Sequence, residues 1–180
     1  MRAYYYDNVP GDQRRSHDHL PSQPVSDETL TKLNIKYWTI PVEGHEEKIN
    51  AIAAERGYKN RDNIHVSKEG MGDAYEDKLK IFFSEHMHED EEIRYILEGQ
   101  GFFDVRESPS DLWIRLAVEP GDLLVVPAGI YHRFTVDESN MIKAMRLFQD
   151  EPKWVPYNRS EETEHNPHRV GYLHDIGVAA

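Results

Sequence analysis

Residues 86–97 read HMHEDEEIRYIL. His86 and His88 lie two positions apart, Glu92 lies four positions further on, and the last five residues are typical of a β-strand. Side chains of equal parity share a face in an extended chain, so we expect the two histidines, Glu92 and Arg94 to point inward together. Neutral imidazoles and carboxylates are ligands of divalent first-row metals. The stretch therefore predicts part of a metal site.

A second block supplies a further candidate ligand. Residues 121–132 read GDLLVVPAGIYH, in which Pro127 and Gly129 fix a sharp turn between a strand-like run and His132. We expect this turn to bring His132 across the barrel to the other candidates. Three imidazoles and one carboxylate would leave an octahedral ion with two open positions, which suit a substrate with two adjacent oxygens.

Short strands dominate the chain from residue 86 to residue 150. Turn residues separate the strand-like runs, and the Gly-Gln-Gly sequence at 99–101 predicts a hairpin turn. Strands at this spacing indicate an antiparallel barrel or jelly roll, so the predicted fold class is mainly β. The runs are 93–97, 102–106, 112–118, 123–126, 132–136 and 142–148.

One domain is expected over residues 1–180, with 1–85 packing on a barrel formed by 86–150 and a tail at 151–180. Before the barrel we expect strands at 3–6 and 37–40, and three short helices. The first helix has Ser26 as its N-cap, the second spans 46–56 and ends at Gly57, and the third spans 75–85 with Asp73 as its cap.

Two segments carry no periodic pattern. The first spans residues 8–24 and is expected to be a surface loop, with His17 and His19 exposed to solvent. The second is the tail after residue 150, which is expected to be solvated and irregular.

Composition excludes several classes of function. The formal net charge is -12, which argues against binding to nucleic acids and to anionic membranes. Cysteine is absent, which rules out disulfides, thiolate-bound zinc and a cysteine nucleophile. No apolar run approaches the roughly 20 residues of a membrane span, and no signal peptide is evident. We expect a monomer in the cytoplasm, with the nucleus as an alternative location.

Both metal-site blocks resemble the two motifs of the cupin superfamily, H-x-H-x3-E-x6-G and G-x5-P-x-G-x2-H. The glycine usual before the first motif is Lys80 here, and the asparagine often found after the second motif is Val136. Neither position is a ligand. The resemblance implies a double-stranded β-helix, or cupin jelly-roll barrel, with a few short flanking helices.

Longer stretches resemble the acireductone dioxygenase family. They run from the N-terminus to residue 148 and include YYYD at 4–7, EEIRYIL at 91–97, FFDVR at 102–106 and LVVPAGIYHRFT at 124–135. The resemblance implies an enzyme of methionine salvage that cleaves acireductone, an enediol with a methylthio tail, with O2. It implies one Fe(II) ion, which yields formate and the 2-oxo acid precursor of methionine, or alternatively Ni(II), which yields carbon monoxide, formate and methylthiopropionate. It also implies that the ligands are His86, His88, Glu92 and His132.

Four other residues are candidates for the substrate pocket. Arg94 shares the ligand face, and its guanidinium would favour a deprotonated enediol. Arg146 could play a weaker version of this role or form a structural ion pair. Phe82 and Phe134 could line the pocket around the methylthio tail or belong to the core.

Two alternatives remain open at this stage. One is another metal-dependent cupin enzyme, such as an isomerase or a different dioxygenase with the same ligands. The other is a non-catalytic cupin that binds a small molecule or a partner protein. Loss of ligands would favour the second alternative, and all four candidate ligands are present.

Overall fold

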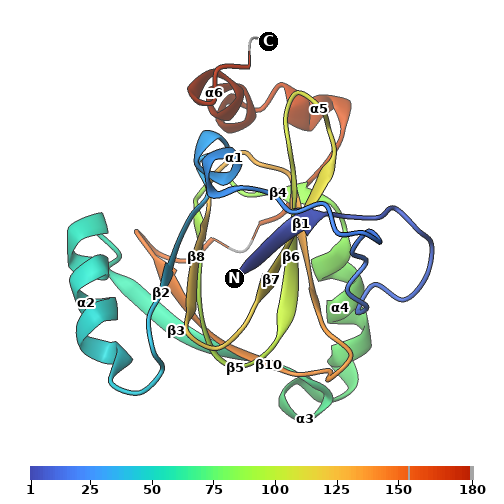
Figure 1. Ribbon diagram of the computed structural model, residues 1–180. Helices are drawn as coiled ribbons and strands as arrows, with labels where there is room; N and C mark the ends of the chain where they lie inside the picture. Colours follow the sequence, from blue (N-terminus) through green and yellow to red (C-terminus); the bar gives the residue numbers. More distant parts are fainter. Residues whose placement is uncertain (154, 179–180) are drawn as a thin grey trace.

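The computed structural model describes residues 1–153 and 155–178, which form two antiparallel β-sheets packed as a barrel (Figure 1). The strand order is β1-β7-β6-β9-β4-β11 in the six-stranded sheet and β2-β8-β5-β10-β3 in the five-stranded sheet. The mainly β jelly-roll prediction is confirmed. The strands are β1 (Arg2–Tyr5), β2 (Lys36–Thr39), β3 (Asn60–Val66), β4 (His86–Met87), β5 (Glu92–Gly99), β6 (Gly101–Arg106), β7 (Trp113–Val118), β8 (Asp122–Val126), β9 (His132–Val136), β10 (Ile142–Phe148) and β11 (Tyr157–Asn158).

The turn at residues 99–101 joins the two sheets. β5 belongs to the five-stranded sheet and β6 to the six-stranded sheet, so the prediction of a hairpin here is wrong. Gly99 has a φ of 77°, and a β-carbon at this position would lie 2.2 Å from the carbonyl oxygen of Met141. Glycine-rich turns mark a sharp change of direction, but the pattern does not say whether the next strand stays in the same sheet.

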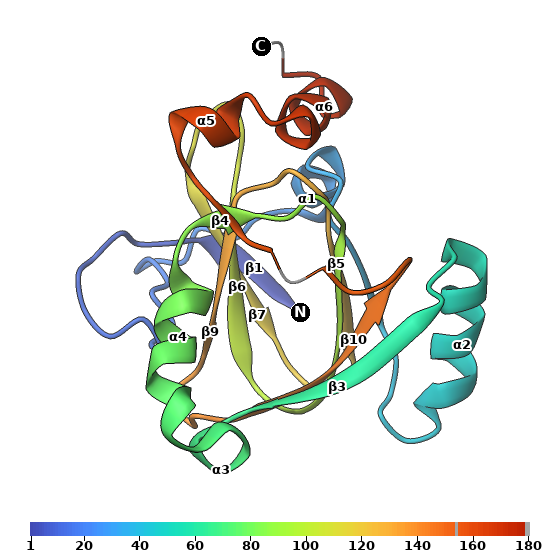
Figure 2. The ribbon, with the colours of Figure 1, turned by 180° about the vertical axis from the view of Figure 1, so that it is seen from behind.

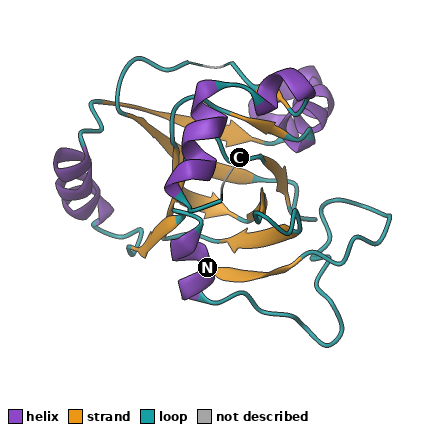
Figure 3. Cartoon of the chain, turned by 90° about the horizontal axis from the view of Figure 1, so that it is seen from above, coloured by secondary structure: helices purple, strands orange, loops and turns teal. Residues whose placement is uncertain are grey.

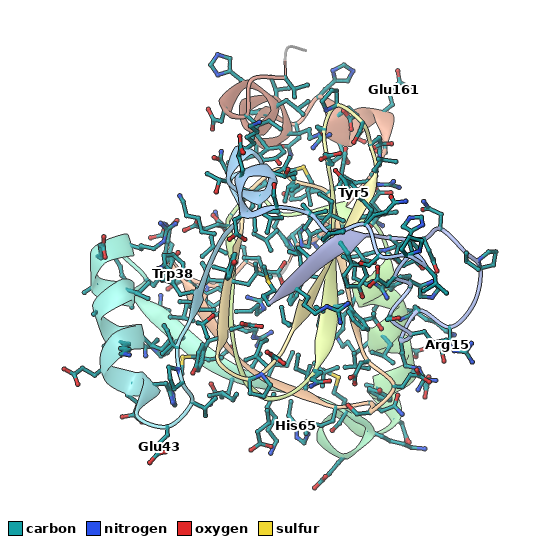
Figure 4. The ribbon with its side chains drawn as sticks, viewed as in Figure 1. Tyr5, Arg15, Trp38, Glu43, His65 and Glu161 are labelled. Carbon is teal, nitrogen blue, oxygen red and sulfur yellow. The ribbon has the colours of Figure 1, made fainter. Side chains whose placement is uncertain are left out.

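The five-stranded sheet is buried on both faces. Odd-numbered residues of β5, β8 and β10 pack with α2 (His45–Arg56), whereas even-numbered residues of the same strands belong to the barrel interior. Trp38 on β2 packs against these odd-numbered residues and lies between the sheet and α2 (Figure 4). This alternation turns Glu92 and Arg94 inward, since they have the parity of the buried interior residue Ile96.

Short helices surround the barrel (Figure 3), and Figure 1 shows α2 and α4 on opposite sides of it. Ser26 caps the first helix and Gly57 ends the second, as predicted. Asp73 is not a cap: it lies in a 3-10 turn, and Ala74 precedes a helix that ends at Phe83. The remaining helices are α1 (Asp27–Lys32), α3 (Lys68–Met71), η1 (Gly72–Ala74), α4 (Tyr75–Phe83), α5 (Glu161–Glu164) and α6 (Pro167–Asp175).

The loop at residues 8–24 extends from one side of the barrel, where Arg15 is labelled in Figure 4. Its His17 is buried, contrary to our expectation, with Nδ1 2.9 Å from Asp7 Oδ1 and Nε2 2.7 Å from the carbonyl oxygen of Asp12. The buried Arg115 donates hydrogen bonds to the carbonyl oxygens of Gln13 and Arg15. The loop is therefore fastened to the barrel by its own backbone.

The tail is folded, which contradicts the expectation of a solvated, irregular segment. It adds β11 to the edge of the six-stranded sheet and then forms α5 and α6 at one end of the barrel (Figure 2). Arg169 and Tyr172 of α6 are buried. Among the described residues, no helix is long and apolar enough to cross a membrane.

Candidate metal centre

Strand pairing brings three histidines together. His86 of β4 stands opposite His132 of β9 in the antiparallel register, and their ring centroids lie 4.5 Å apart. His88 follows β4 directly, and its ring lies 4.9 Å from that of His86 and 5.3 Å from that of His132. One ring nitrogen from each histidine lies within 4.8 Å of the others, a spacing that suits a shared metal ion.

Backbone carbonyls fix the orientation of all three imidazoles. The Nδ1–H groups of His86, His88 and His132 donate to the carbonyl oxygens of Ser84, Val155 and Ile130 at 2.6, 3.1 and 3.0 Å, respectively. A carbonyl oxygen can only accept, so each neutral ring carries its proton on Nδ1. Each Nε2 therefore keeps a free lone pair, which is the state that binds a metal ion.

Glu92 adjoins this group at the start of β5. Its Oε2 lies 2.6 Å from Nε2 of His132, and its Oε1 lies 2.8 Å from Nη2 of Arg94. Among the described residues, neither Oε2 of Glu92 nor Nε2 of His132 has a hydrogen-bond partner of acceptable geometry, although both atoms are buried. Two buried lone pairs this close repel unless a cation or a proton stands beside them. The donor set therefore fits a divalent ion.

Electrostatics keep these groups in their metal-binding protonation states. Burial lowers the pKa of His86 to about 4, and the neighbouring His132 acts in the same direction. Burial also lowers the pKa of His88. Burial alone would raise the pKa of Glu92, but the charge of Arg94 holds it well below its usual value. At neutral pH, His86 and His88 are thus neutral and Glu92 is a carboxylate anion.

A cavity of about 390 Å³ opens beside these residues. Arg94 and the four candidate ligands line one part, and the other part is mostly apolar. Phe82 and Phe134 both line it, in an edge-to-face pair with centroids 6.0 Å apart. The apolar wall is completed by Ile64, Val66, Ile96, Phe103, Ile142 and Ala144.

Arg146 forms an ion pair at the wall of the cavity. It lines the cavity, and its guanidinium also pairs with Asp62 of β3 at 2.7 and 2.8 Å. The sequence therefore predicted the residues at the polar end of the cavity. It did not lead us to Ile64 and Val66, because β3 offers only these two alternating apolar residues after the polar run at 60–63.

Comparison with known proteins identifies the family. The ARD/ARD' family model matches residues 2–156. Acireductone dioxygenase 1 of Coprinopsis cinerea is 73% identical over 180 residues, with 100% of both chains covered. Acireductone dioxygenase of Aspergillus fumigatus is 53% identical over 176 residues, which cover 98% of this chain and 97% of that protein.

A solved structure shows the same architecture. Acireductone dioxygenase from Bacillus anthracis, with a cadmium ion in its active centre, superposes with a TM-score of 0.63 at 25% sequence identity. The match covers 77% of this chain and 94% of that one. Together with the matches in sequence, this likeness settles the classification: the chain belongs to the ARD/ARD' family.

Proposed function

We propose that this protein is an acireductone dioxygenase that holds one Fe(II) ion per chain. Its proposed substrates are acireductone and O2, and its products are formate and the 2-oxo acid precursor of methionine. With Ni(II) in the same site, we propose the route to carbon monoxide, formate and methylthiopropionate. The observation that carries the proposal is the set of three imidazoles whose Nε2 lone pairs converge beside Glu92 at the cavity.

The proposed ligands are His86, His88, Glu92 and His132. Three neutral imidazoles and one carboxylate would leave a divalent ion with a net charge of about +1 and two of six positions open. When bound, such an ion supplies Lewis-acid polarisation of the substrate oxygens and a redox partner for O2. Imidazole and carboxylate suit both iron and nickel, so the choice of metal is a matter for experiment.

The cavity residues account for binding of the rest of the substrate. The guanidinium of Arg94 lies next to Glu92 with only 15% of its side chain exposed, and there it would hold the negative charge of the deprotonated enediol. Phe82 and Phe134 would pack on the methylthio tail and exclude water from it. Arg146 would add positive charge at the cavity wall while Asp62 keeps its side chain in place.

The test is metal analysis of protein purified from cells grown with limited iron or limited nickel, followed by product analysis of each form. We expect about one ion per chain, O2 consumption that requires both acireductone and the ion, and different products for the two metals. Full activity after removal of the metal by a chelator would overturn the proposal.

Ligand variants separate this proposal from the alternatives. His132→Ala should lose metal and activity together, because its imidazole faces both His86 and Glu92. A metal-replete wild-type protein that never consumes O2 with acireductone would instead point to another cupin enzyme or to a non-catalytic binding protein.

A further inference from the structure

Each of the three histidines has a neighbour in sequence that contacts the C-terminal segment, which we define as residues 157–175. These neighbours are Glu85 before His86, Glu89 after His88 and Tyr131 before His132. The segment comprises β11, α5 and α6, and it lies beyond residue 156, where the match to the family model ends. Figure 2 shows it in red, passing β4 and covering one end of the barrel.

Glu89 receives hydrogen bonds from two residues of the segment. Tyr157 Oη donates to Glu89 Oε1 at 2.8 Å, and Asn166 Nδ2 donates to Oε2 at 3.2 Å. Because Glu89 follows His88 directly, these bonds restrain the backbone that carries this imidazole.

Arg159 binds the residue before His86. Its Nη1 donates to Glu85 Oε2 at 2.9 Å, and its Nη1 and Nη2 contact Asp111 at 2.9 and 3.2 Å. Next to Arg159 in the chain, β11 pairs with β4, so that Asn158 stands opposite His86. The segment therefore fixes β4 through both backbone pairing and an ion pair.

The turn before His132 is held by α6. Arg169 is buried, and its Nη1 donates to the carbonyl oxygen of Gly129 at 3.1 Å. The ring of Tyr131 is contacted by two guanidinium groups of the segment, Arg159 at 4.9 Å and Arg169 at 4.3 Å from its centroid. A β-carbon on Gly129 would lie 2.3 Å from the carbonyl oxygen of His168, so α6 packs directly on this turn.

We propose that the C-terminal segment positions the three histidines and thereby controls how long the metal ion is retained. This inference rests on the proposed ligand set. Groups that orient metal ligands change metal affinity by roughly 10–100-fold when they hydrogen-bond the ligand directly. Tyr157 and Arg159 act one residue away, so removing their contacts should speed metal release by about 3- to 10-fold. They are positioning residues, since neither lines the cavity of the proposed site.

The experiment uses the full-length protein loaded with Co(II), a coloured probe for an imidazole and carboxylate site. Tyr157→Phe removes one 2.8 Å hydrogen bond to a carboxylate, and Tyr37→Phe is its matched control, because Tyr37 donates to Asp27 at 2.8 Å far from the site. We expect similar small losses in melting temperature for both variants. Only Tyr157→Phe should release Co(II) to a chelator faster and shift the visible absorption of the bound ion.

A second matched pair removes a guanidinium. Arg159→Met deletes ion pairs with Glu85 and Asp111 and a contact with the ring of Tyr131. Arg2→Met is the control, because it deletes an ion pair with Asp18 and a contact with the ring of Tyr4. The double variant with Tyr157→Phe should release Co(II) faster than either single variant. Equal release rates and unchanged spectra in all variants, with melting temperature alone lowered, would overturn the inference.

The outcomes also distinguish this inference from the proposed function. If wild-type protein binds no Co(II), or if His132→Ala binds it as tightly as wild type, the ligand set itself is wrong. If wild type binds Co(II) and His132→Ala does not, but the Tyr157 and Tyr37 variants behave alike, the ligand set stands and the positioning role of the segment fails.

Discussion

The imidazole of His86 titrates differently in the folded and the unfolded chain. Its pKa is about 4 in the folded protein without metal, because burial disfavours the charged ring, whereas an ordinary histidine has a pKa of 6.5. Between these values the unfolded chain binds more protons, so the contribution of His86 to stability is full above pH 6.5 and is lost as the pH falls toward 4. At roughly 1.4 kcal/mol for each pKa unit, the loss amounts to at most about 3.5 kcal/mol.

Urea unfolding of the metal-free protein between pH 4 and pH 7 measures this effect. We expect the midpoint to fall with pH in wild type and to fall less steeply in His86→Gln, which has no titrating ring at this position. Equal slopes for the two proteins would contradict the assignment.

Replacement of Arg94 by methionine should separate binding of the metal from turnover. The guanidinium pairs with Glu92 at 2.8 Å and lines the cavity, but it is not a proposed ligand. We expect metal content close to wild type and a fall in kcat/KM of about 10²-fold or more, the range for removing one preorganised charged donor. Arg146→Met is the control with a smaller expected loss, since Arg146 pairs with Asp62 of β3 and not with a proposed ligand. Steady-state kinetics and metal analysis of each variant measure these effects. A wild-type turnover rate in Arg94→Met would refute the role of Arg94 in the reaction.

For single residues, the sequence predicted which side chains meet at the site, but it did not predict which backbone groups orient them. The spacing of His86, His88 and His132 was enough to predict that the three rings meet. Their partners are the carbonyls of Ser84, Ile130 and Val155, which any residue type could supply. The burial of His17 also escaped prediction, because its partner Asp7 lies ten residues earlier in an aperiodic stretch.

The corner between β5 and β6 depends on a backbone conformation that suits glycine. Gly99→Ala would place a β-carbon 2.2 Å from the carbonyl oxygen of Met141, at a φ of 77°. The conformation alone costs about 1–2 kcal/mol, and the clash adds to it, so we expect a loss of at least roughly 2 kcal/mol. Chemical denaturation measures the loss.

Gly171→Ala is the matched control for this substitution. Gly171 lies inside α6, and nothing lies within 4 Å of an added β-carbon. Alanine should therefore stabilise the protein by up to about 1 kcal/mol, opposite in sign to the effect at Gly99. If the two substitutions changed the free energy of unfolding alike, the account of the corner would fail.

Strands with a regular alternation of apolar and polar residues could be predicted from the sequence. Elements that form because of their contacts with the rest of the fold could not. Alternation identified the strands of the barrel within one or two residues at their ends. β3 escaped because its first four residues are polar and it forms the edge of its sheet. α6 escaped because one of its two buried side chains is Arg169, and the charge of arginine predicts exposure.

At the scale of the whole molecule, the proposed ligands join the two sheets. His86 and His132 belong to the six-stranded sheet, and Glu92 belongs to the five-stranded sheet. An ion that binds only the folded chain stabilises it by about 2.7 kcal/mol at a free concentration of 100 times its dissociation constant. For a chain of this size, each kcal/mol raises the melting temperature by about 2–4 °C.

Calorimetry with Ni(II) and with a chelator tests this linkage. Wild type should melt several degrees higher with metal, by the same linkage argument. His132→Ala should show little or no difference between the two conditions. A rise of equal size in both proteins would show that the ion stabilises the fold from somewhere else.

The hydrogen bonds from the three Nδ1 groups to peptide carbonyls have a consequence for how this scaffold can diverge. A substitution changes a side chain but leaves the backbone carbonyl in place, so the orientation of the rings depends on the path of the main chain. The side chains of the apolar wall, such as Ile142 and Phe134, take no part in these hydrogen bonds. Evolution or protein design could therefore alter the part of the cavity that accepts the substrate tail while the three histidines keep their orientation.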